Sequence, residues 1–242
     1  MTPSSRNVSV LCPVVVAVAL SAAGCGGGDG GRAAQARQAG DRALPAGTGY
    51  TSDQLRQALA SEYVGYRRAG EPDSGEYGSL KGIQNFAQLQ RQVTFDKPEC
   101  ADATGVGIVG DPELRTVPAA LSTFAKGTGQ SAATTLMAVP ASAAERHVRV
   151  RVPGKCKRFR TKVGGRWSDH EVLESGGGGL GMGSRTVGVA TTSGGSAVKT
   201  WYVVLRGRGY LATVSLYGPT VTRTEAEQLA RQTYDHAERI LP

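Results

Sequence analysis

Residues 185–217 read RTVGVATTSGGSAVKTWYVVLRGRGYLATVSLY, and this stretch decides the fold class. It contains three runs rich in Val, Leu, Thr and Tyr, which are separated by short segments that contain glycine. Short connections of this kind join antiparallel neighbours, because parallel strands need a crossover of a dozen or more residues. The stretch therefore predicts three consecutive antiparallel strands. Their expected ranges are 185–192, 197–206 and 210–217, joined by residues 193–196 and 207–209.

The residues before this stretch predict more of the same sheet. Phe159, Thr161 and Val163 alternate with cationic residues, which is the period of a strand. The pair Gly164–Gly165 follows and favours a two-residue hairpin turn that returns through residues 167–173. We also expect a strand over 133–139, a short strand over 91–95 and a flexible glycine-rich loop over 176–183.

Helix signals are spread along the chain. Thr51 and Gln54 form a capping box that predicts a first helix, and Thr222 and Glu225 form a second one at the start of an amphipathic final helix. Residues 140–152 combine an alanine-rich helix start with alternating valines, and we favour the helix. A further helix is expected over 118–126, where Pro118 starts a run that ends in Lys126 and Gly127.

These elements together predict an α+β fold in a single domain. We expect a central, largely antiparallel sheet with helices packed on one face, because runs of strands and separate helices assemble in that way.

The first 24 residues have the features of a secretory signal. Arg6 precedes an apolar run from Val8 to Ala23, and small residues come just before Cys25. The segment resembles a lipobox, in which the cysteine after the cleavage site accepts a diacylglyceryl group, with Ala22 where Leu is commoner. We therefore expect a lipoprotein, anchored at Cys25 by acyl chains such as palmitate to the extracellular face of the plasma membrane.

The remaining chain divides into a tether and a folded part. Residues 25–50 are rich in Gly, Ala, Gln and Arg and have almost no large apolar side chain before Leu44. Such a segment buries too little apolar surface to offset its chain entropy, so we expect a flexible tether. The domains predicted are a signal peptide over 1–24, the tether over 25–50 and one folded domain over 51–242.

Cysteine usage points to one disulfide. Cys12 lies within the apolar core of the signal and Cys25 is the lipid acceptor, which leaves Cys100 and Cys156. Outside the plasma membrane the compartment is oxidising, and no paired histidine accompanies either residue as a metal site would require. We expect a bond between Cys100 and Cys156, the alternative being two free or metal-bound thiols.

A basic segment is the candidate site for an anionic partner. The chain has a formal net charge of +8, and residues 146–166 contain no acid. A strand over this segment places Arg158, Arg160 and Lys162 on one face, with a spacing that suits a polyanion. The alternative, which we favour, is a solvated sheet face, because the segment lacks interleaved aromatic residues. Outside a bacterium the abundant polyanions are lipid headgroups and cell-wall polymers, so no nucleic acid partner is expected.

No pattern in the chain predicts catalysis. Gly176, Gly178 and Gly181 match a dinucleotide motif in spacing, but a strand follows them where the motif needs a helix. His147, His170 and His236 have no spacing typical of zinc ligands. The chain has no nucleophile elbow and no marked pair of carboxylates. We therefore expect no metal, no cofactor and no enzyme, and a secreted hydrolase is the least favoured function.

The order of short motifs resembles a known family. The motifs are Asp53–Leu55, Pro98–Ala101, Pro140–Ala144, Gly154–Cys156 and Glu238–Ile240. In this order, with a β-rich half and a terminal helix, the chain resembles the extracellular sensor domain of PknH-type Ser/Thr kinases of actinobacteria, which also occurs on stand-alone lipoproteins. The resemblance covers about residues 51–241 and implies an α+β fold with an antiparallel sheet, a broad cleft and disulfide bonds. This chain has one candidate disulfide where the kinase-borne form has two, and its 242 residues include no kinase domain.

Two functional hypotheses follow. The first is a lipid-anchored, non-catalytic domain that binds a small or amphiphilic ligand in a cleft, as a sensor does. The second is an adaptor whose basic face binds an anionic envelope polymer, lipid headgroups or a partner protein. An internal apolar cavity would support the first hypothesis, and a continuous positive face without a cavity would support the second.

Overall fold

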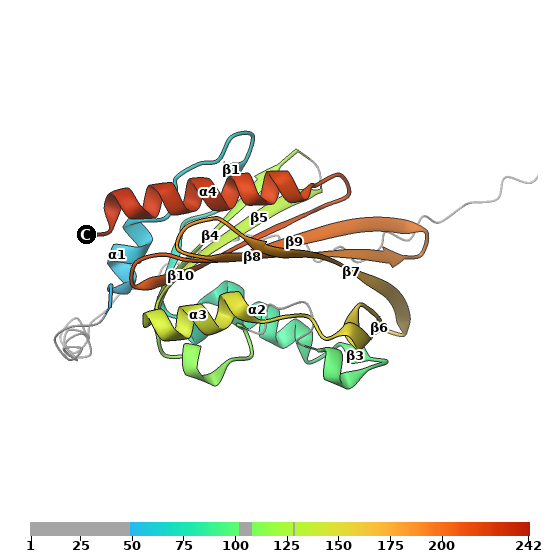
Figure 1. Ribbon diagram of the computed structural model, residues 1–242. Helices are drawn as coiled ribbons and strands as arrows, with labels where there is room; N and C mark the ends of the chain where they lie inside the picture. Colours follow the sequence, from blue (N-terminus) through green and yellow to red (C-terminus); the bar gives the residue numbers. More distant parts are fainter. Residues whose placement is uncertain (1–48, 102–107, 128) are drawn as a thin grey trace, which may run out of the picture. The chain divides into compact units, whose positions relative to one another are not determined.

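The computed structural model describes residues 49–101, 108–127 and 129–242 (Figure 1). Residues 47–242 form one compact unit. The expected signal peptide over 1–24, the lipid acceptor Cys25 and the tether up to residue 48 lie outside the described residues. Within the described part, no helix is both long and apolar enough to cross a bilayer.

A single antiparallel sheet of ten strands forms the centre of this unit. The strand order is β1-β4-β5-β10-β9-β8-β7-β6-β3, and β2 pairs with β4 beside β1. The strands β1 to β5 are Arg67–Arg68, Asp73–Glu76, Thr94–Phe95, Pro118–Lys126 and Gln130–Ala138. The strands β6 to β10 are Arg158–Val163, Arg166–Gly178, Ser184–Ser193, Ser196–Arg206 and Tyr210–Gly218.

The stretch that decided the fold class forms the middle of the sheet, as predicted. Strands β8 and β9 pair from Ser184↔Leu205 to Ser193↔Ser196, and β10 pairs with β9 from Leu211↔Arg206 onward. Gly194 and Gly195 have φ values of 56° and 84°, which is the backbone of a type I′ hairpin turn. Gly164 and Gly165 repeat these dihedrals between β6 and β7, so the second predicted hairpin is confirmed as well.

The predicted α+β fold with an antiparallel sheet is confirmed, but the helices cover both faces rather than one. Figure 1 shows α4 (Arg223–Ile240) and α1 (Ser52–Gln57) on one side of the sheet, and α2 (Lys81–Gln90) and α3 (Ala141–Arg149) on the other. The central strands explain this arrangement, because neighbouring residues point to opposite faces and both sets are apolar. Val203 and Leu205 pack with α4, whereas Val204 packs with α3.

The prediction of a helix over 118–126 is wrong, because these residues form the strand β4. The strand lies between β5 and the short strands β1 and β2, so apolar residues occur on both of its faces. Ala119 belongs to one core cluster and Ala120 and Phe124 belong to the other. A strand that is buried on both sides loses the strict alternation that identifies it in a sequence. Pro118 is tolerated because it is the first residue of the strand.

The other expectations are largely confirmed. The capping box of Thr51 begins α1, residues 141–149 form the helix α3, and Thr222 caps α4. The loop expected over 176–183 is shorter than predicted, because β7 continues to Gly178 after a register shift between Glu174 and Gly177. The helix α2, which the sequence did not reveal, places Ile83 against the core beside α3.

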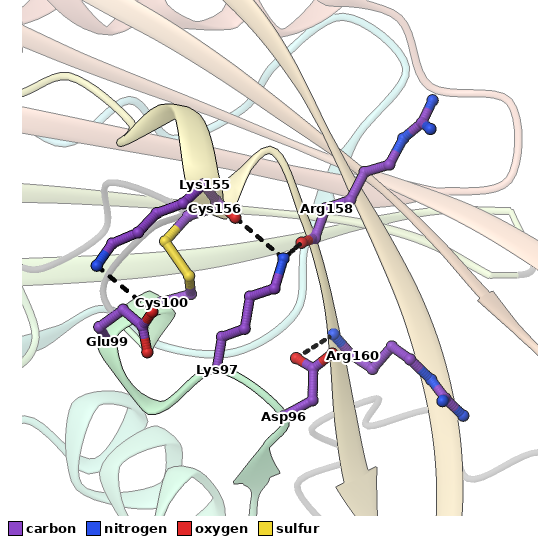
Figure 2. Close-up of a disulfide and its surroundings, with 8 residues drawn as sticks. All are labelled: Asp96, Lys97, Glu99, Cys100, Lys155, Cys156, Arg158 and Arg160. Atoms are coloured by element: carbon purple, nitrogen blue, oxygen red, sulfur yellow. Dashed lines mark hydrogen bonds and ion pairs between the residues drawn. A yellow bond between two sulfur atoms is a disulfide. The ribbon is translucent and has the colours of Figure 1, made fainter.

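A small third core surrounds the disulfide between Cys100 and Cys156 (Figure 2). Both half-cystines are fully buried, with Cα atoms 5.4 Å apart. They pack with Val152, Phe159 and Val172. The bond therefore joins the turn after β3 to the turn before β6, at the edge of the sheet where few strands contribute to a core.

We predict that the disulfide stabilises the domain substantially. Replacing both cysteines, Cys100→Ser with Cys156→Ser, should lower the free energy of unfolding by roughly 2–4 kcal/mol, because the bond closes a long loop and restricts the unfolded chain. Urea denaturation of the chain that begins at Gly26 measures this difference. Peptide mapping without reductant is the control, and two freely alkylated thiols in the folded protein would contradict the assignment.

We also predict that the domain loses stability in mild acid. The ring of His170 stacks on Phe159 at 4.8 Å, and burial lowers its pKa below the ordinary 6.5, although Asp169 and Asp96 act in the opposite direction. The folded state then binds a proton less readily than the unfolded state, so full stability above about pH 6.5 declines as the pH falls toward the folded pKa. Burial also lowers the pKa values of His147 and His236, so these two residues likewise make the domain less stable as the pH falls.

Urea denaturation at pH 7.5 and 5.5 tests this prediction. The unfolding free energy should be smaller at pH 5.5, and His170→Asn should reduce the difference between the two pH values. An equal pH dependence in the variant and the parent protein would show that His170 is not involved.

Candidate functional site

The three cations predicted to bind an anion lie on one face of β6, and their neighbours on β7 are mostly acids. Arg158 forms an ion pair with Glu171 at 2.8 Å, and Arg160 forms one with Asp169 at 3.3 Å. Lys162 lies opposite Trp167, with its ammonium 5.8 Å from the centre of the indole. Exposed pairs of this kind contribute only about 0–1 kcal/mol each, but they neutralise the strand locally. The face is therefore a set of cross-strand pairs and not a continuous positive surface.

A basic hollow of about 410 Å³ lies at the beginning of β6, next to the disulfide. The ammonium of Lys97 is committed to the fold there, because it donates to the carbonyl oxygens of Lys155 and Arg158 at 3.1 and 2.7 Å (Figure 2). Lys155 pairs with Glu99 at 3.4 Å. Figure 2 shows the guanidinium groups of Arg158 and Arg160 pointing away from the disulfide. The hollow therefore consists largely of cations that already have partners.

A larger groove lies between the segment 60–67 and the helix α4. Its volume is about 650 Å³, and it is open to solvent. Figure 1 shows the segment that leads into β1 beside α4. Residues of the segment line one side of the groove, namely Ala60, Glu62, Tyr63, Val64, Gly65, Tyr66 and Arg67. The helix α4 lines the other side with Gln232, His236 and Arg239.

The segment is fixed in place by the buried hydroxyl of Tyr63. This hydroxyl makes hydrogen bonds with Thr134 of β5 at 2.9 Å and with Thr233 of α4 at 2.7 Å. The hydroxyl of Thr233 donates in turn to the carbonyl oxygen of Leu229. The Tyr63 ring packs edge-on against Phe124 at 4.7 Å, and burial raises the pKa of its phenol. A satisfied polar network of this kind holds the segment to the sheet and to α4 at once.

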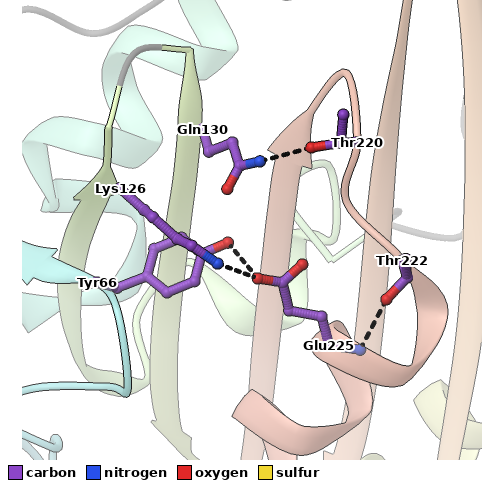
Figure 3. A network of polar contacts seen from close by, with 6 residues as sticks. All are labelled: Tyr66, Lys126, Gln130, Thr220, Thr222 and Glu225. Carbon is purple, nitrogen blue, oxygen red and sulfur yellow. Dashed lines mark hydrogen bonds and ion pairs between the residues drawn. The ribbon is translucent and has the colours of Figure 1, made fainter.

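Tyr66 fixes the other end of the segment (Figure 3). Its hydroxyl donates to the carboxylate of Glu225 in the first turn of α4 at 2.9 Å. The ammonium of Lys126 donates to the same oxygen at 2.9 Å and lies 5.0 Å from the centre of the Tyr66 ring. The pKa of the Tyr66 phenol is raised by burial first and then by its bond to Glu225, so the phenol stays protonated and continues to donate. Two tyrosines therefore hold the groove open in one geometry.

The exposed cations of the groove favour an anionic group, although Arg239 also makes a hydrogen bond of 3.5 Å with the imidazole of His236. Arg67 and Arg239 are exposed and bring two positive charges, against the single carboxylate of Glu62. The pKa of His236 is lowered by burial and then by Arg239, which keeps the imidazole neutral at neutral pH as a hydrogen-bonding group. Val64 adds an apolar surface at the mouth, with 79% of its surface exposed. Guanidinium groups beside a neutral imidazole and one apolar side chain suit a small anionic or amphiphilic ligand.

Two of the patterns considered in the sequence can be placed in the structure. In this part of the chain no three His, Cys, Asp or Glu side chains are close enough together to hold a metal ion. The glycines of the dinucleotide-like motif lie at the end of β7 and before the strand β8, so no helix N-terminus follows them. Gly181 has a φ of 56° and is packed against Tyr234, which indicates a structural turn.

Sequence reasoning did not find this groove. Tyr63 and Tyr66 follow Leu55 and Leu59 at helical spacing in the sequence, although α1 ends at Gln57. His236, which has no spacing typical of a zinc ligand in the sequence, lines the groove. Gly65, whose φ is 80°, and Gly70 are the residues in the sequence that indicate an end of the helix before about residue 66.

Comparison with known proteins supports the fold and nothing finer. No family model and no curated protein matches the chain. Among solved structures, the extracellular domain of PknH from Mycobacterium tuberculosis matches with a TM-score of 0.52 at 13% sequence identity, over 79% of this chain and 98% of that domain. An uncharacterised protein from Mycobacterium smegmatis matches with a TM-score of 0.43 at 18% identity, over 78% of this chain and 95% of that protein. The resemblance inferred from the sequence is thus confirmed at the level of the fold, and this chain folds like the PknH extracellular domain.

Proposed function

We propose that this protein is a lipid-anchored, non-catalytic binding domain on the outer face of the plasma membrane. The signal-like residues 1–24 and the acceptor Cys25 support the anchor, and the disulfide is typical of an oxidising compartment. A fold shared with the extracellular domain of a kinase supports the same location. The fold itself does not identify a ligand, so the binding function is argued from the groove.

The groove between the segment 60–67 and α4 is the proposed binding site. The observation that carries this proposal is the pinning of the segment by Tyr63 and Tyr66, which contact β5 and α4 through buried or half-buried hydroxyl groups. A site held in one geometry before binding loses little conformational freedom when a ligand enters. Arg67 and Arg239 would bind an anionic group, and Val64 would contact an apolar part of the same ligand.

This proposal moves the ligand from the sheet to the space beside α4. The sequence hypothesis was a small or amphiphilic ligand in a cleft of the sheet, whereas the groove uses one helix and the segment before β1. The alternative hypothesis, an adaptor with a basic face, is weakened because Arg158 and Arg160 already have carboxylate partners on β7. The groove, with exposed cations, is the better site for an anionic ligand.

We predict that Cys25 determines the location of the protein. Two acyl chains hold a protein on a membrane stably, because each buried methylene contributes about 0.8 kcal/mol. Cys25→Ala should therefore leave unprocessed precursor or release soluble protein, as measured by membrane fractionation and by mass spectrometry of the N-terminus. A Cys25→Ala protein that stays in the membrane with a cleaved N-terminus would contradict the lipoprotein assignment.

We predict that a ligand co-purifies with the protein through the groove. Native mass spectrometry of protein extracted from its own membrane should show an added mass that Arg239→Gln removes or strongly reduces, because a guanidinium that binds an anion cannot be replaced by a neutral amide. Arg231→Gln, on the same helix and also exposed, is the matched control and should retain the added mass. An added mass unaffected by Arg239→Gln, or no added mass at all, would count against the groove.

A further inference from the structure

The end of the β6–β7 hairpin exposes two large apolar side chains. Val163 and Trp167 flank the turn, with 47% and 37% of their surfaces exposed. Figure 1 shows this hairpin extending beyond the ends of both α3 and α4. Neither residue is needed to fill a core, since none of the three core clusters includes them. An aromatic side chain that protrudes in this way costs free energy in water and suggests a binding partner.

Two cationic side chains lie close to the indole of Trp167. The guanidinium of Arg160 lies 4.8 Å from the ring centre and the ammonium of Lys162 lies 5.8 Å from it. Arg166 is exposed at the turn itself. Asp169 is the sole acid in residues 160–169 and is paired with Arg160, so three cations against one carboxylate leave this segment with a net charge of +2.

The neighbouring hairpin does not offset this charge. The turn between β8 and β9, Ser193–Ser196, is uncharged, and the strands around it contribute Lys199 as the one charged residue over 186–200. Thr192 of β8 pairs with Asp169, so the two hairpin ends lie side by side in the sheet. The end of the β6–β7 hairpin therefore carries two exposed apolar side chains, Val163 and Trp167, among cations, and it lies beside an uncharged turn.

We propose that this end of the sheet, which we call the hairpin tip and define by Arg160, Lys162, Val163, Arg166 and Trp167, docks onto a bilayer that contains anionic lipid. Tryptophan is enriched at the boundary between headgroups and acyl chains, where its amphipathic ring is stable. Lysine and arginine beside it reach the phosphates with their long side chains. An anionic polymer would satisfy the cations but would leave Val163 and Trp167 in water, so the exposed apolar pair favours the lipid surface.

The hairpin tip shares no residue with the groove, and it can be tested in a chain that lacks Cys25. The chain that begins at Gly26 retains the compact unit 47–242 and lacks the lipid acceptor. It contains two tryptophans, of which Trp201 is 8% exposed and packed over Gly188, so a change in emission on adding vesicles reports mainly on Trp167.

The experiment compares vesicles of phosphatidylcholine alone with vesicles that also contain phosphatidylglycerol. With anionic vesicles at low salt we expect a blue shift of tryptophan emission, quenching by brominated acyl chains, and sedimentation of the protein. These effects should be absent with phosphatidylcholine alone and should decrease as salt screens the charges. Sedimentation without any change in emission would overturn the proposal, because it would place Trp167 outside the bilayer.

Matched variants distinguish insertion of Trp167 into the bilayer from electrostatic attraction of the protein to its surface. Trp167→Ala should weaken binding severalfold, while Phe86→Ala, which removes an aromatic side chain of the same 37% exposure from α2, should leave it unchanged. Arg166→Gln should weaken binding about fivefold, the effect of one cation near an anionic membrane, and the exposed Arg231→Gln on α4 should not. Trp167→Tyr, which keeps an interfacial side chain, should retain most of the affinity.

Two outcomes would overturn the docking of the hairpin tip on lipid. Equal binding by Trp167→Ala and the parent protein would show that only charge matters, which is the behaviour expected of an anionic polymer as the partner. The absence of binding to anionic vesicles by a protein with native circular dichroism would exclude the lipid surface altogether.

Discussion

The central strands β9 and β10 must be buried on both faces, and the rest of the domain is arranged to meet that requirement. Val203, Val204 and Leu205 are consecutive, so any arrangement as a strand sends them to opposite sides of the sheet. Each such side chain loses roughly 1.5–3 kcal/mol of stabilisation if it is left in water. One layer of helices cannot cover both sides. The helix α4 covers the face of Val203 and Leu205, and α3 covers that of Val204.

The groove depends on the helix that covers one of these two faces. The helix α4 crosses the sheet as an amphipathic cylinder, and its polar side remains beside the segment that enters β1. The side chains of Tyr63 and Tyr66 hold this segment to β5 and α4, and the guanidinium of Arg68 holds it by donating to the carbonyl oxygen of Ala60. The two tyrosine hydroxyl groups would each cost free energy if they were buried without partners, and this cost selects the one loop geometry that satisfies them. The shape of the groove therefore follows from the hydrogen bonds that these buried hydroxyl groups require.

Charge on the sheet surface follows a related rule. The basic strand β6 pairs with a strand that contributes Asp169 and Glu171 at the facing positions, so the charges are neutralised in rows across the sheet. On this face, Lys162 lies opposite Trp167, whereas Arg158 and Arg160 lie opposite acids, and the pair Val163–Arg166 next to the turn adds a further cation. Positive charge thus remains mainly at the hairpin tip and not along the whole strand. Pairing register decides which cations of a basic segment are available to a partner.

The sequence by itself determined the local features whose signals lie within a few residues. The glycine pairs 164–165 and 194–195 require positive φ and identify the two hairpins, and the capping residues Thr51 and Thr222 identify α1 and α4. The pairing of Cys100 with Cys156 followed from the number of cysteines and the expected oxidising compartment.

Tertiary structure decided what local patterns cannot encode. Residues 118–126 are a strand because both faces are covered. Tyr63 and Tyr66 lie beyond α1 in a segment that is held by the bonds of their hydroxyl groups to Thr134, Thr233 and Glu225. Both outcomes depend on contacts between residues that are distant in the chain. The free energy of such burial and hydrogen bonding outweighs the weaker helix or strand propensity of a local segment.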